Sequence, residues 1–204
     1  MTTTVTGLFD RYDDASATVD ALERAGIPSS DISILANNDN GRARVNDAGN
    51  DTSKAVEDAE TGAGVGAAVG GIGGLLTGLG LMAIPGVGPV VAAGWLAATA
   101  AGAVTGAVVG GAAGGIVGAM TEAGVPEDEA HVYAEGIRRG GTLVTAKVED
   151  ALVANARAII AEHKSADVTQ RRTDYEADGW KRFDESASTP TQDALRDTRN
   201  LPPL

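Results

Sequence analysis

The chain of 204 residues is long enough for one ordinary domain with a hydrophobic core and an additional segment. Only 3% of the residues are aromatic, so the core must consist mainly of Ala, Val, Leu and Ile. The formal net charge of -12 repels nucleic acid and anionic lipid headgroups, and we expect no nucleic-acid partner. Cysteine is absent, which excludes disulfides, thiol nucleophiles and cysteine-ligated metal centres.

Residues 1–36 predict the first half of a folded domain. The run TVTGLFD favours a short strand, and a helix follows in which Ala15, Val19 and Leu22 share one face before Gly26 ends it. The run DISILAN then favours a second strand. The opening MTTTVTGLFDRYDD lacks the basic start and apolar run of a secretion signal, so we expect the N-terminus to stay in the cytoplasm.

Residues 37–60 predict a polar linker with a short helix, whereas residues 61–121 contain no Asp, Glu, Lys, Arg or His. Glycine recurs in this apolar segment at intervals of four residues, which on a helix leaves a strip without side chains where another helix packs closely. The segment therefore predicts a long glycine-zipper α-helical hairpin. Its bend consists of Pro85, Gly86, Gly88 and Pro89. Its helix-packing positions are Gly62, Gly66, Gly70, Gly74, Gly78, Gly102, Gly106, Gly110, Gly114 and Gly118.

Such a hairpin needs a compensating environment, because each glycine inside a helix costs about 1 kcal/mol relative to alanine. A lipid bilayer supplies one, since the backbone finds no water there and helix is nearly obligatory. From Gly62 to Met82 a helix would be about 31 Å long, close to the hydrocarbon thickness of about 30 Å. Trp95 would then lie near the headgroups. The alternative is a soluble assembly in which the hairpins pack on each other without lipid.

Residues 122–170 predict the second half of the domain. Pro126 and the acids after it favour a helix start, and TLVTAKV alternates like a half-buried strand. Asp150 can cap a helix in ALVANARAIIAEHK, and ADVTQ, residues 166–170, favours a last strand. The two halves together predict an α+β fold, a ferredoxin-like split βαβ sandwich with one sheet and helices on a single face, interrupted by the hairpin.

Residues 171–204 are polar and without periodicity, so we predict a disordered C-terminal tail. The tail nevertheless contains Tyr175, Trp180 and Phe183, three of the few aromatic residues of the chain. Aromatic side chains in such a segment either dock into the groove of a protein partner or pack back on the parent domain. The sequence favours neither reading over the other.

No pattern of a catalytic or cofactor site emerges. A Walker loop requires a lysine that residues 61–121 lack, and the dinucleotide-binding pattern of glycines is also missing. His131 shares a predicted helix with Glu127, Glu129 and Glu135, and a His/Glu pair four residues apart can ligate a metal. Because no further ligand is apparent, a solvated helix face is the favoured interpretation. We therefore predict no catalytic residue, no cofactor and no metal.

Two stretches carry a family resemblance. VTGLFDRYDDASATVDALERAGIPSSDISILAN and AGVPEDEAHVYAEGIRRGGTLVTAKV together are similar to the bacterial general stress protein 17M-like family, also called heat-induced stress proteins. Gly7, Phe9, the turn at residues 25–28 and RRGGTLV at residues 138–144 carry the similarity. The resemblance implies a non-enzymatic protein linked to stress survival, often with a Gly/Ala-rich hairpin bending at an IPG-G motif, as in residues 84–88.

These observations predict a non-enzymatic, stress-associated structural protein. In the main interpretation the glycine-zipper hairpin anchors it in the inner (cytoplasmic) membrane, with both termini cytoplasmic, and also drives homo-oligomerisation. In the alternative the protein is cytoplasmic, and its hairpins pack into a soluble particle or filament.

Overall fold

The computed structural model describes residues 2–38, 80–84, 86–99 and 115–186. The strands are β1 (Thr2–Phe9), β2 (Ile32–Asn37), β3 (Gly80–Ile84), β4 (Gly88–Gly94) and β5 (Thr142–Glu149). The helices are α1 (Tyr12–Arg24), the short 3-10 helix η1 (Ser29–Asp31), α5 (Gly115–Glu122), α6 (Glu127–Arg138), α7 (Val153–Glu162) and α8 (Val168–Ala177). Residues 95–99, directly after β4, are also helical. The α+β class predicted from the sequence is confirmed.

All described strands form one antiparallel sheet in the order β1-β5-β2-β4-β3. Strand β5 lies between β1 and β2, which α1 connects. The predicted last strand at residues 166–170 is wrong, because α8 begins at Val168. Asp167 caps this helix, and its carboxylate accepts hydrogen bonds from the backbone N–H groups of Thr169 at 2.8 Å and Gln170 at 2.9 Å. The second βαβ unit of the predicted ferredoxin-like sandwich is therefore not formed.

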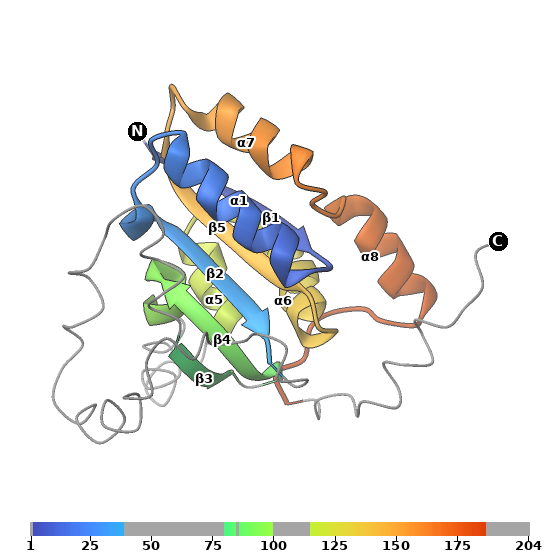
Figure 1. Ribbon diagram of the computed structural model, residues 1–204. Coiled ribbons are helices and arrows are strands. Elements are labelled where there is room, and N and C mark those ends of the chain that lie inside the picture. The colour runs from blue at the N-terminus through green and yellow to red at the C-terminus, as the bar shows by residue number, and fades with distance from the viewer. Residues whose placement is uncertain (1, 39–79, 85, 100–114, 187–204) are drawn as a thin grey trace, which may run out of the picture.

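Helices cover both faces of the sheet, so the prediction of helices on a single face is also wrong. Figure 1 shows α1 and α7 on one face and α5 and α6 on the other. Two separate apolar cores result, one on each face. The sheet needs cover on both faces because its strands carry apolar side chains on both faces. In β2, for example, Ile34 belongs to the core under α1 and its neighbour Leu35 to the core under α5 and α6, and both are fully buried.

The middle of the apolar segment forms a β-hairpin where we predicted two helices and a bend. Strand β4 pairs with β2, and β3 pairs with β4 along the edge of the same sheet. Between them the chain turns through Gly86 and Gly88, both with positive φ angles, and the N–H of Val87 donates to the carbonyl of Ile84 at 3.0 Å. The β-branched Val90 and Val91 are buried in β4, where the pleated sheet suits them better than a helix does.

Of the predicted bend residues, Gly86 and Gly88 thus lie at a turn between strands, Pro89 lies near the start of β4, and Pro85 lies outside the described residues. Of the predicted helix-packing glycines, Gly118 lies half-buried in α5. The other nine lie in parts of the chain that the structure does not describe, so the glycine zipper stays a prediction: Gly62, Gly66, Gly70, Gly74, Gly78, Gly102, Gly106, Gly110 and Gly114.

The prediction that a helical hairpin anchors the protein in a membrane is also corrected. Within residues 2–38, 80–84, 86–99 and 115–186, no helix combines the length and the apolar character that crossing a bilayer requires. Trp95, expected near lipid headgroups, instead packs against the domain. Its indole N–H donates to the carbonyl of Asp31 at 2.9 Å, and the ammonium of Lys147 lies 4.0 Å from the centre of its ring.

The predicted disorder from residue 171 onward is wrong for residues 171–186. Helix α8 includes residues 171–177, and a turn and an extended segment follow it as far as Ser186. The side chains of Tyr175 and Phe183 are each only 5% exposed. Residues 187–204 lie beyond the part of the chain that the structure describes.

Candidate functional site

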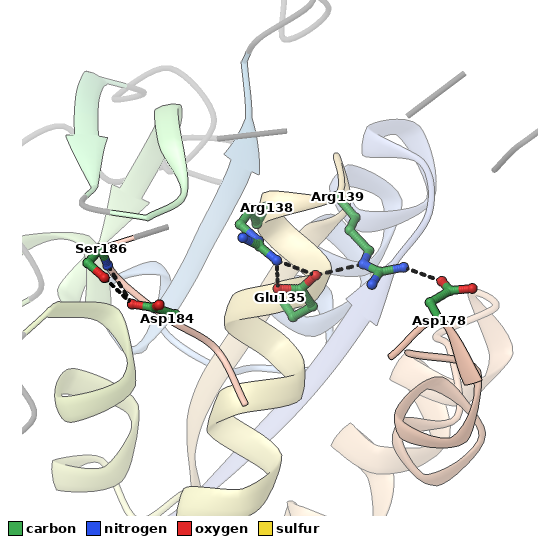
Figure 2. A network of polar contacts seen from close by, with 6 residues as sticks. All are labelled: Glu135, Arg138, Arg139, Asp178, Asp184 and Ser186. Carbon is green, nitrogen blue, oxygen red and sulfur yellow. Dashed lines mark hydrogen bonds and ion pairs between the residues drawn. The ribbon is translucent and has the colours of Figure 1, made fainter. Parts of the chain in front are cut away.

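A buried carboxylate organises the C-terminal end of α6. Glu135 is fully buried, and its two oxygens bind the guanidinium groups of Arg138 and Arg139, each at 2.7 Å (Figure 2). Arg139 continues outward to Asp178, with a distance of 2.7 Å between nitrogen and oxygen. Burial alone would lower the pKa of Arg139, but the hydrogen bonds to Glu135 and Asp178 outweigh burial and raise it. The network therefore keeps a buried charge paired and joins α6 to the chain after α8.

Residues 178–186, which we call the C-terminal strap, follow α8 and cross the end of the domain. The Arg139–Asp178 ion pair holds its start, and Tyr175 supports that pair because the guanidinium of Arg139 lies 4.2 Å from its ring centre. Farther along, Phe183 inserts into the core that α5 and α6 share. Figure 2 shows Asp178 on one side of the Glu135 network and Asp184 and Ser186 on the other.

Arg182 of the strap binds two side chains of α6. Its Nη2 lies 2.6 Å from the Glu127 carboxylate, and its Nε–H donates to Nε2 of His131 at 2.8 Å. An imidazole nitrogen that accepts this bond carries no proton, so His131 is neutral in this arrangement. Burial, and then the charge of Arg182, lower the pKa of His131, although Glu127 and Asp128 act in the opposite direction.

These contacts correct the interpretation of His131 as part of a solvated helix face. The side chain is almost fully buried beneath the strap. Its Nε2 lies 3.7 Å from Glu127, but Arg182 occupies the same side of the ring. Among the described residues, no group of three or more His, Cys, Asp or Glu side chains is placed to hold a metal ion.

The end of the strap lies against two pieces of the apolar segment. Gly86, in the turn between β3 and β4, approaches so closely that a Cβ there would lie 2.6 Å from the Cα of Glu185. A Cβ on Gly115, the first residue of α5, would collide with the Glu185 carboxylate. Burial, and then the charge of Asp184, raise the pKa of this carboxylate. The strap thus fixes the β3–β4 turn and the start of α5 relative to each other.

Each of the three aromatic residues predicted in the tail makes a different contact with the domain. Tyr175 supports Arg139, Phe183 fills the core, and Trp180 is half-buried with its ring edge-on to Tyr175 at 5.8 Å. Of the two readings that the sequence left open, the structure shows the aromatics packing back on the parent domain. Sequence reasoning missed Asp178, Arg182 and Glu185, because an extended strap has no periodicity; the interleaving of charges with aromatics was the available signal.

Fold and strap define an antiparallel α+β domain closed by its own C-terminal segment. Residues 4–85 match the family model described as "Heat induced stress protein YflT domain". This match confirms the resemblance to the heat-induced general stress proteins for the first part of the chain. The second resembling stretch, residues 123–148, lies outside the matched range. No curated protein and no solved structure matches the chain.

Proposed function

We propose that this protein is a non-enzymatic, stress-associated structural protein that assembles with copies of itself through the apolar segment, without lipid. This is the self-assembling alternative from the sequence, with one change. The β-hairpin of β3 and β4 takes the role that we predicted for a helical hairpin.

The observation that carries the proposal is the composition of β3. Among the described strands, β3 forms the end of the sheet opposite β1, and its sequence GLMAI contains no charge. The Leu81 side chain is 67% exposed. Natural proteins protect edge strands with charges, proline or a covering element, because an unprotected apolar edge pairs with other chains. Within the part of the chain that the structure describes, β3 has neither charge nor proline. The absence of this protection is expected if β3 is the surface through which copies of the protein associate.

The use of the charged groups supports a structural rather than an enzymatic role. Glu135, the fully buried acid of α6, has both oxygens taken by arginines. His131 has its accepting nitrogen taken by Arg182. Both groups are therefore used to hold α6 and the strap in place.

The direct test is the mass of the full-length protein in solution, measured by sedimentation velocity. The wild-type chain is expected to form oligomers, and Leu81→Lys is expected to weaken association at least about tenfold, because the lysine places a charge on the pairing edge. Ala158→Lys adds the same charge to an exposed position of α7 and is the matched control; it should assemble like the wild type. A monomeric wild type, or oligomers that survive Leu81→Lys, would refute the proposal.

A further inference from the structure

The edge of the sheet formed by β1 offers backbone hydrogen-bonding groups in a regular row. The carbonyl of Leu8 accepts a bond at 2.7 Å from the N–H of Ala166, which lies outside the sheet, so this carbonyl points away from β5. In an antiparallel ladder the direction alternates residue by residue. The N–H and C=O groups of Thr2, Thr4 and Thr6 therefore also point away from β5, and no backbone group of the described residues pairs with them.

A pocket of about 510 Å³ runs along this edge. Its floor is residues 3–6 of β1, one wall comes from α6 and the residues before it, and the other wall comes from α7. Because helices stand on both sides, the groove admits a single extended chain. The edge of another folded sheet would not fit, because the helices that cover that sheet would collide with α6 and α7. Thr6 lines the pocket, and its buried hydroxyl has no hydrogen-bond partner among the described residues.

The two walls differ in charge. On the α6 side, Glu129 interacts with the hydroxyl of Tyr133, whose pKa is raised by burial and by that carboxylate. On the α7 side, Arg157 is exposed beside Ile160, and it has no ion-pair partner within the part of the chain that the structure describes. The groove therefore presents a cation without an ion-pair partner among the described residues on its α7 wall, next to apolar surface, and a carboxylate that interacts with the Tyr133 hydroxyl on its α6 wall.

We propose that this groove binds an extended segment of another protein, which adds to β1 as a further strand and places an acidic side chain against Arg157. From Thr2 to Thr6 the strand covers about 13 Å, enough to pair with four or five residues of such a segment. Main-chain hydrogen bonds would supply affinity, and the apolar wall with Arg157 would supply selectivity. This inference is independent of self-association through β3.

The probe is a fluorescein-labelled, acetylated heptapeptide of alternating Thr and Val with Glu at its centre, tested on the full-length chain by fluorescence polarisation. Peptides with Gln or Lys at the centre should bind progressively more weakly, and a version N-methylated at alternate residues should not bind. In the complex, hydrogen exchange of the Thr4 and Thr6 amides should slow at least about tenfold.

Thr6→Pro removes an outward N–H without breaking the ladder to β5, so it should weaken binding about tenfold while the melting temperature stays close to that of the wild type. Arg157→Glu should abolish the preference for the acidic peptide. The proposal is overturned if the Glu peptide fails to bind at about 1 mM, if the N-methylated peptide binds equally, or if free acetate competes as well as the peptide does. It is also overturned if Thr6→Pro dissociates oligomers while peptide binding persists, since the groove would then bind a second copy.

Discussion

The two edges of the sheet differ in what surrounds them. Edge strand β1 lies in a groove between α6 and α7, its exposed groups are mainly backbone and threonine, and Ala166 covers its end. Edge strand β3 exposes an apolar side chain, Leu81, and the C-terminal strap holds its turn. The comparison teaches that the two edges of one antiparallel sheet can differ in character, one enclosed by helices and one with an exposed apolar side chain.

The largest effect is expected from Glu135→Ala, because α6 lines the groove at β1 and holds the strap that contacts the β3–β4 turn. Removing this carboxylate leaves Arg138 and Arg139 close together without their shared counter-ion, and breaking such a buried pair costs about 3–5 kcal/mol. Urea denaturation should show this loss. The matched control is Glu122→Ala at an exposed position of α5, which should change the free energy of unfolding by less than about 0.5 kcal/mol. A loss at Glu135 no larger than at Glu122 would mean that the network is not structural.

Phe183→Ala should affect the two edge strands, β3 and β1, to different extents. The substitution leaves a cavity in the core beside α5 and α6 and costs about 3 kcal/mol. Because the strap contacts the β3–β4 turn, hydrogen exchange should accelerate in β3 and α5 first, whereas β1 should keep most of its protection. Equal acceleration in both edge strands would show that the strap does not act selectively on β3.

Gly86→Ala tests the contact between the strap and the β3–β4 turn, and Gly26→Ala is the matched control. Gly86 and Gly26 both have positive φ angles, at 73° and 92°, so alanine strains the backbone by about 1 kcal/mol at either position. Only at Gly86 would the new Cβ meet the backbone of Glu185; at Gly26 nothing lies within 4 Å. Thermal denaturation should therefore show a larger loss for Gly86→Ala. Equal losses would argue against the contact.

The smallest effect is expected from pH, through His131. Its folded-state pKa lies below the ordinary value, so the unfolded chain binds the proton more readily. The contribution of the neutral side chain is complete above about pH 6.5 and is lost as the pH falls toward the folded-state pKa. The groups facing it are Arg182, Glu127 and Asp128.

Denaturation at about pH 7.5 and about pH 5.5 measures this loss, and His131→Gln should reduce the difference. A wild-type protein that gains stability from His131 on acidification would contradict the Arg182–His131 contact.

Local patterns predicted the first part of the fold well. The strand, helix and strand of residues 1–36 appear as β1, α1 and β2, because their periodicity and the Gly26 stop act within a few residues. The residues TLVTAKV likewise lie in β5.

The apolar segment could not be read in this way. Its glycine spacing fits a helix, but residues 90–93 are held as a strand by pairing with β2, more than 50 residues earlier in the chain. Such tertiary pairing overrides local preference. The same residues, Gly86 and Gly88, turn the chain in either fold, so the position of the bend was predictable and the secondary structure around it was not.

The candidate site was largely hidden from the sequence for a related reason. The strap has no repeat, and its position depends on single contacts, such as Arg182 with His131 and Phe183 with the core. The aromatics were visible as exceptions in a polar tail, but Tyr175 and Phe183 find their partners more than 30 residues earlier, in and directly after α6.

The account depends most on the pairing of β4 with β2, because it makes the apolar segment part of the sheet. The chain has no native cysteine, so a pair of introduced cysteines tests it directly. In this register Asn37 lies opposite Val90, and Asn37→Cys with Val90→Cys should form a disulfide on mild oxidation, since facing residues fall within bonding distance. Asn37→Cys with Val91→Cys is the control, because that side chain points to the other face. Cross-linking of the Val90 pair alone is the predicted result; cross-linking of neither pair, or of both equally, would contradict the account.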